Sequence, residues 1–143
     1  MKKIFYFIIP VAIIVIAASY FKGNSSSVPT ASSTSSSTSS SCMMTPQDYL
    51  KADKSDAVII DVRTQGEYDY GHLEGAIVVD IYQRDFRDKI NKLDKSKTYY
   101  VYCKTGIRSR NAVAYMRQVG FEKVCDLQGG VNYLARAGVK FVK

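Results

Sequence analysis

Short apolar runs alternate with helix-like segments along the chain from residue 42 onward, and this alternation constrains the fold more than any other feature. The apolar runs contain many β-branched and aromatic residues, as buried strands do. Helical crossovers between such strands predict an α/β fold in which helices flank a mainly parallel sheet on both faces. Ligands of such sheets bind beyond the carboxyl ends of the strands. We expect strands at 57–61, 76–79, 98–102 and 123–127, and helices at 45–52, 64–71, 82–93, 109–119 and 131–137.

The first 22 residues differ from the rest in composition. Two lysines precede an uncharged run of 18 residues, from residue 4 to 21, which is closed by Lys22. As a helix this run is roughly 27 Å long, close to the thickness of a bilayer core. It is interpreted either as a signal peptide or as an N-terminal membrane anchor, with the anchor slightly favoured. Both interpretations predict an exported or membrane-anchored, extracytoplasmic protein of the cell envelope.

Residues 23–41 form a segment of a second kind, with eleven Ser, three Thr and no charged residue among its nineteen positions. It has little to bury, so we expect a flexible linker that joins the first segment to a single domain at 42–143. The 143-residue chain is too short for a multidomain enzyme. Its net charge of +7 includes no basic run in the domain, which argues against a nucleic-acid partner.

One segment joins a strand to a helix with residues suited to nucleophilic chemistry. Backbone amides and a helix N-terminus at such a junction favour a thiolate, which is the nucleophilic form of cysteine. A glycine lets the short loop close, and the two basic side chains are candidates to bind an anion held above the sulfur. The segment is Cys103-Lys104-Thr105-Gly106-Ile107-Arg108, and we expect its cysteine to present a negatively charged sulfur that a reagent can reach.

The chain from about residue 44 to 137 resembles the single-domain rhodanese family of sulfurtransferases. The resemblance rests on several strings in the same order and spacing, which are Asp61-Val62-Arg63, Glu67-Tyr68, Gly71-His72-Leu73-Glu74-Gly75-Ala76-Ile77, the Cys103 loop, Gly120-Phe121 and Leu127-Gln128-Gly129-Gly130. It implies a three-layer α/β fold and a catalytic Cys103 that accepts a sulfane sulfur as a persulfide. The loop 104–108 would then bind a small anionic donor, such as thiosulfate or polysulfide, and a thiol or cyanide-like molecule would accept the sulfur. The resemblance implies no metal or organic cofactor, and we expect a monomer.

Two other functions remain open for the same loop. Cysteine phosphatases related to this fold place five residues between Cys and Arg, whereas only four separate Cys103 from Arg108 here, so phosphatase or arsenate chemistry is the weaker alternative. A carrier or protein-binding module that presents a persulfide to an envelope partner is the other. The family often has arginine where this chain has Lys104, which leaves the anion preference in doubt.

Residues near the loop receive mainly structural interpretations. Asp61 is expected to orient the loop or Arg63, and the helical spacing of Arg63 and Glu67 predicts an ion pair between them. His72, the one histidine, is expected to have a structural role in its turn rather than to act as a base.

The remaining cysteines and glycines are interpreted in the same way. Cys125 is expected to behave as a small buried hydrophobe and Cys42 as an unpaired thiol in the linker, although three cysteines outside the cytoplasm raise the question of an internal disulfide. Gly129 and Gly130 are expected to permit a tight turn.

Overall fold

The computed structural model describes residues 42–143. The membrane segment and the serine-rich linker predicted for 1–41 lie outside the described residues. No helix within the described part of the chain is long and apolar enough to cross a membrane.

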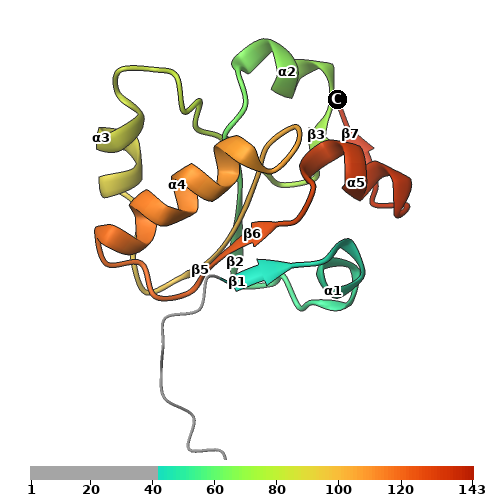
Figure 1. Cartoon of the computed structure of the whole chain (residues 1–143), viewed down its shortest axis with the longest axis horizontal. Coiled ribbons are helices and arrows are strands. Elements are labelled where there is room, and N and C mark those ends of the chain that lie inside the picture. Colours follow the sequence, from blue (N-terminus) through green and yellow to red (C-terminus); the bar gives the residue numbers. More distant parts are fainter. Residues whose placement is uncertain (1–41) are drawn as a thin grey trace, which may run out of the picture. The chain divides into compact units, whose positions relative to one another are not determined.

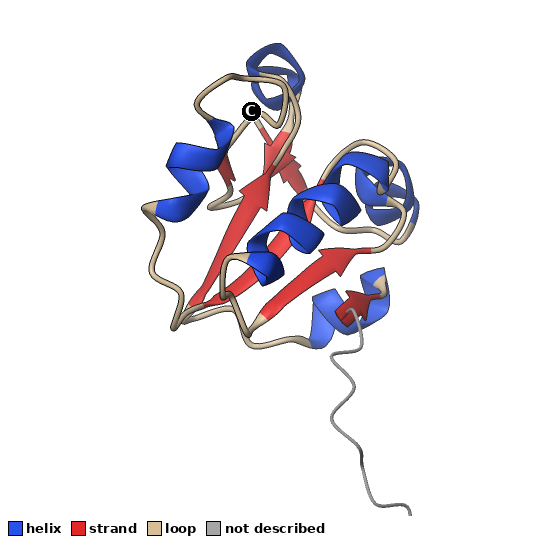
Figure 2. Cartoon of the chain, turned by 60° about the vertical axis from the view of Figure 1, so that its left-hand side comes forward, coloured by secondary structure: helices blue, strands red, loops and turns tan. Residues whose placement is uncertain are grey.

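The described chain forms an α/β fold around a five-stranded parallel sheet of order β1-β6-β5-β2-β4. Figures 1 and 2 show the strands with helices around them. A separate antiparallel pair joins β3, in the middle of the chain, to β7 near its end. The predicted fold class is therefore confirmed. The elements in chain order are β1 (Cys42–Met44), α1 (Pro46–Lys51), β2 (Ala57–Asp61), α2 (Gln65–Tyr70), β3 (His72–Leu73), β4 (Ile77–Val78), α3 (Phe86–Asn91), β5 (Thr98–Tyr102), α4 (Ile107–Gln118), β6 (Val124–Leu127), α5 (Gly130–Arg136) and β7 (Phe141–Val142).

Two cores lie on opposite faces of the sheet, because successive side chains of a strand point to opposite faces. On one face, Val101 and Cys103 pack with α3 and α4 in one cluster. On the other, Tyr100 and Tyr102 pack in a second cluster that contains Leu134 of α5. The central strand β5 thus contributes to both cores and positions the residue that follows it.

The residues that precede α2 and α4, the two helices near the site, favour the start of a helix. Thr64 caps α2 through a capping box with Glu67, which satisfies backbone donors at the helix start. Gly106 precedes α4 with a φ of 95°, a left-handed conformation that glycine adopts without strain. The predicted start of this helix at residue 109 was two residues late, because the glycine turn leads directly into it.

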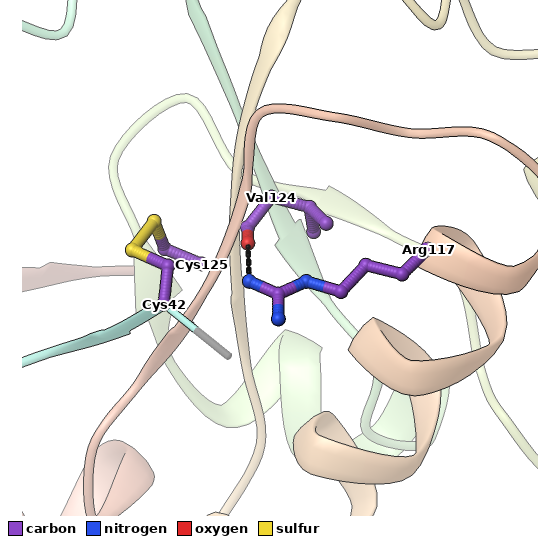
Figure 3. The surroundings of a disulfide bond; sticks show 4 residues. All are labelled: Cys42, Arg117, Val124 and Cys125. Atoms are coloured by element: carbon purple, nitrogen blue, oxygen red, sulfur yellow. Dashed lines mark hydrogen bonds between the residues drawn. A yellow bond between two sulfur atoms is a disulfide. The ribbon is translucent and has the colours of Figure 1, made fainter. Parts of the chain in front are cut away.

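A disulfide joins Cys42 of β1 to Cys125 of β6, which are direct neighbours in the parallel register (Figure 3). The prediction that Cys42 is an unpaired linker thiol was wrong, and so was the prediction that Cys125 is a free hydrophobe. β1 had not been predicted as a strand, and its pairing with β6 is what brings the two sulfurs together. Beside the disulfide, Arg117 of α4 donates to the Val124 carbonyl at 2.9 Å (Figure 3).

Candidate active site

The Cys103 sulfur lies at the carboxyl end of β5, inside the turn that leads into α4. The backbone amide of Gly106 donates to the sulfur at 3.1 Å. The Ser109 hydroxyl, in the first turn of α4, lies 3.5 Å from the sulfur and 3.2 Å from the Gly106 carbonyl. The loop is therefore closed around the sulfur, in the arrangement expected from the sequence.

These donors change the acidity of the thiol. Burial is the largest single influence and disfavours the charged form, but the Ser109 hydroxyl and the amides of Ser109, Thr105 and Gly106 together outweigh it, so the pKa of Cys103 lies below its ordinary value. Hydrogen bonds that stabilise the anion act in this direction. The loop thus favours a thiolate, the nucleophilic form of cysteine.

The sulfur is not open to solvent, because Cys103 is 0% exposed and belongs to the core on the α3 and α4 face. A reachable sulfur had been expected, and this expectation was wrong. Lys104, Thr105 and Ile107 are exposed around it, so the covering loop carries its polar and apolar groups outward. In this conformation a reagent does not reach the sulfur from solvent, so a reaction at Cys103 requires local opening of the structure.

The start of α5 is hydrogen-bonded to the backbone of the loop. The Val131 amide donates to the Cys103 carbonyl at 2.8 Å, and the Asn132 amide donates to the Lys104 carbonyl at 3.3 Å. Gly130, with a φ of 60°, packs so closely that a Cβ there would overlap the Cys103 carbonyl oxygen and lie 2.7 Å from the Lys104 carbonyl carbon. The double glycine therefore does more than permit a turn, because it lets two backbone segments touch beneath the nucleophile.

The arginines near the loop form ion pairs, of which the pair of Arg63 with Asp61 agrees with the expected orienting role of Asp61, whereas the pair of Arg108 was not predicted. Arg63 pairs with Asp61, with Nη2 at 2.6 Å from the carboxylate, and also donates to the Gly71 carbonyl at 2.7 Å. Arg108 binds Glu67 through two hydrogen bonds of 2.7 and 2.8 Å. The predicted pair between Arg63 and Glu67 was wrong, because Arg63 precedes the cap of α2 and folds back onto its own strand.

Asp61 and Arg63 therefore have a structural role, since their ion pair joins the end of β2 to the Gly71 carbonyl. Both are buried, and the Arg63 guanidinium lies 5.6 Å from the ring centroid of Tyr102. The Tyr102 hydroxyl accepts from the Leu73 amide at 3.0 Å, which ties β5 to β3. His72 of β3 stacks on Tyr68 at 3.7 Å between ring centroids.

Asp126 of β6 is a buried acid that the sequence analysis did not single out. Its two carboxylate oxygens are buried without a hydrogen-bond partner among the described residues, at a hollow of about 240 Å³ also lined by Arg110 and Arg117. Burial raises the pKa of Asp126 against the opposing influence of the Ser109 hydroxyl and Arg110. A charged residue within the apolar run 123–127 was the available signal. Among residues 42–143, no three His, Cys, Asp or Glu side chains lie together so that they could hold a metal ion.

Comparison with known proteins places this loop in a family. The profile of the rhodanese-like domain matches residues 45–137, which include both Cys103 and Arg108. The chain belongs to the rhodanese-like domain family. A rhodanese-related protein from Thermoplasma volcanium has a similar structure, with a TM-score of 0.64 and 27% identity over 71% of this chain and 97% of that one. A rhodanese-like domain from the Anabaena Alr3790 protein gives a TM-score of 0.62 with 29% identity over 70% of this chain and 77% of that one.

Curated relatives carry this domain within longer proteins. A tRNA uridine(34) hydroxylase of Cytophaga hutchinsonii is 39% identical over 82 residues, which are 55% of this chain and 26% of that protein. The protein of the same name from Cronobacter sakazakii is 37% identical over 100 residues, or 62% of this chain and 29% of that one. The rhodanese-like chain described here thus spans less than a third of these relatives.

Proposed function

We propose that this rhodanese-like domain is a sulfurtransferase that carries a sulfane sulfur on Cys103. The observation that carries the proposal is the cradle around the sulfur, in which the Gly106 amide and the Ser109 hydroxyl face an atom whose pKa is lowered despite burial. Preorganised donors of this kind stabilise an anion without rearrangement. Only four residues separate Cys103 from Arg108, which suits one transferred sulfur better than a tetrahedral phosphate.

The reaction has two displacements. In the first, the Cys103 thiolate attacks the outer sulfur of the donor, a new S–S bond forms, and the donor's old sulfur bond breaks to release sulfite from thiosulfate or a shortened anion from polysulfide. In the second, an acceptor thiolate or cyanide attacks the outer sulfur of the persulfide, and the thiolate of Cys103 leaves. The amides of the loop stabilise the cysteine anion before and after transfer, while the start of α5 holds the loop backbone.

The location of the protein is part of the proposal. We place the domain outside the cytoplasm, joined to the cell envelope through residues 1–22, because the disulfide between Cys42 and Cys125 supports an oxidising compartment. A small anionic donor, a thiol or cyanide-like acceptor, a monomeric state and the absence of a nucleic-acid partner belong to the same proposal.

The test is direct. Thiosulfate or polysulfide should leave the intact protein heavier by one sulfur, and the Cys103→Ser variant should stay unmodified. A wild-type protein that gains no sulfur from several donors would contradict the proposal. Hydrolysis of a simple aryl phosphate would support the phosphatase alternative instead.

A persulfide carrier for a protein partner is a second candidate. Complete burial of Cys103 favours it, together with Ile107 at 61% exposure and Tyr82 at 70% exposure, whose ring faces Arg108. Slow sulfur release to every small acceptor, combined with rapid release to an envelope protein, would decide for the carrier.

A further inference from the structure

The one arginine of the active-site loop is already occupied by an acid of this chain. Arg108 donates from both terminal nitrogens to the two oxygens of Glu67, and the side chains are only 17% and 30% exposed. A bidentate arginine–carboxylate pair is among the strong polar contacts of proteins, and partial burial limits its screening by salt. An anionic donor that needs this guanidinium must therefore compete with Glu67.

Glu67 is held in place from its own side as well. Its carboxylate accepts from the Thr64 amide at 3.2 Å and from the Thr64 hydroxyl at 3.1 Å. Because these bonds form the cap of α2, the acid cannot swing away from Arg108 without weakening the start of that helix. Glu67 is therefore a fixed negative charge beside the loop.

The other cations of the site do not replace the neutralised arginine. Arg63 is buried in its pair with Asp61. Arg110 lies beside Gly106, but it lines the hollow that Asp126 also lines. Of the two basic residues within the described loop 104–108, Lys104 is then the one that remains, and it is exposed.

The charges around the sulfur indicate which sulfur donors the site favours. The Cys103 thiolate and Glu67 contribute two negative charges, and Arg108 and Lys104 contribute two positive ones. A dianion such as thiosulfate meets no surplus of positive charge, so it is repelled more than a donor with one negative charge or none.

We propose that Glu67 is a specificity-determining residue, which selects a hydropersulfide, RSSH or its monoanion, over the thiosulfate dianion as the sulfur donor. This inference rests on the proposed sulfurtransferase function. The step is balanced: the Cys103 thiolate bonds to the outer sulfur of RSSH, the S–S bond of the donor breaks, and RS⁻ leaves with the electron pair. The proton stays on the new persulfide or passes to water.

The experiment compares two donors on three forms of the full chain. Cysteine hydropersulfide and thiosulfate are each mixed with wild type, Glu67→Gln and Asp69→Asn, and the rate of sulfur gain at Cys103 is followed by mass spectrometry with peptide mapping. Glutamine keeps one oxygen that can accept from the Thr64 amide in the capping box, and it removes the charge together with one of the two oxygens that accept from Arg108. Asp69 lies on the same helix and bonds to Gln65, so its variant removes an equal charge away from Arg108.

In the wild type, we expect the hydropersulfide to react faster than thiosulfate. Glu67→Gln should raise the thiosulfate rate about tenfold, the effect of one partly screened charge near the donor, and change the hydropersulfide rate much less. Asp69→Asn should match the wild type.

The outcomes separate this inference from the proposed function. A wild type that prefers thiosulfate, or a Glu67→Gln variant that leaves the ratio of the two rates unchanged, would overturn the selectivity. No sulfur on Cys103 in any form with either donor would instead overturn the sulfurtransferase proposal. If Glu67→Gln does not fold, a wild type that prefers thiosulfate still overturns the selectivity.

Discussion

Substitution of Gly130 by alanine tests whether the start of α5 supports the nucleophile. The added methyl would overlap the Cys103 carbonyl oxygen and lie 2.8 Å from the Lys104 carbonyl oxygen. Both atoms are backbone, so they cannot rotate away as a side chain would. The loop and the start of α5 would have to separate.

The expected cost has two parts. Alanine at a φ of 60° is strained by about 1 kcal/mol. Overpacking adds about 1–3 kcal/mol, including any loss of the two amide bonds from Val131 and Asn132. We therefore expect the free energy of unfolding to fall by about 2–4 kcal/mol.

Gly138→Ala provides the matched control. Gly138 also has a left-handed φ, of 85°, but a Cβ there meets nothing within 4 Å. Its substitution should cost only the conformational strain, about 1 kcal/mol. The difference between the two variants isolates the close approach beneath the loop.

Two measurements decide the outcome. Urea denaturation gives the free energy of unfolding, and the rate of iodoacetamide alkylation reports opening of the loop over Cys103. We expect Gly130→Ala to accelerate alkylation and Gly138→Ala to leave it unchanged. Equal stability losses in both variants, with equal alkylation rates, would refute the supporting role of α5.

Three further predictions concern charge and sulfur. The hydrogen bond from Arg108 lowers the pKa of Glu67 from 4.5 to about 2. This pair should therefore stabilise the fold above pH 4.5 and cease to do so as the pH falls toward 2. The free energies of unfolding of wild type and Glu67→Gln, measured by urea titration, should then converge at the acid end of this range. Ser109→Ala removes a donor that lowers the pKa of Cys103, so the pH profile of alkylation should move to higher pH, and an unmoved profile would exclude this role. Reduction of the disulfide between Cys42 and Cys125, which are 83 residues apart, should lower the free energy of unfolding by about 4 kcal/mol in urea titrations with and without reductant, and a double serine variant should show no such difference.

The central strands were predictable because their own residues specify them. The predicted strands at 57–61 and 98–102 coincide with β2 and β5, since continuous β-branched and aromatic runs suit a position buried on both faces. β1, β3 and β7 have only two or three residues each, so no period could appear, and their pairing comes from distant parts of the chain. The Cys42–Cys125 disulfide was not predictable for the same reason.

The backbone conformation of the site could be predicted from the sequence, whereas the pairing of its charged side chains could be predicted only in part. The spacing of Cys103, Gly106 and Arg108 specifies a turn into a helix, and the turn is present. The pairing of Arg108 with Glu67, 41 residues away, depends on where α2 lies beside the loop, and local spacing misassigned this acid to Arg63. Burial of Cys103 likewise depends on packing that no single segment encodes.

The placement of the disulfide has a chemical consequence for the persulfide that we propose on Cys103. Thiol–disulfide exchange needs the attacking sulfur to reach a disulfide sulfur directly. Cys125 packs with the core on one face of the sheet, whereas Cys103 belongs to the core on the other. Among the described residues the sheet therefore separates the two sulfur centres, and a sulfur carried on Cys103 in the proposed reaction would be released to molecules that arrive from outside rather than to this disulfide.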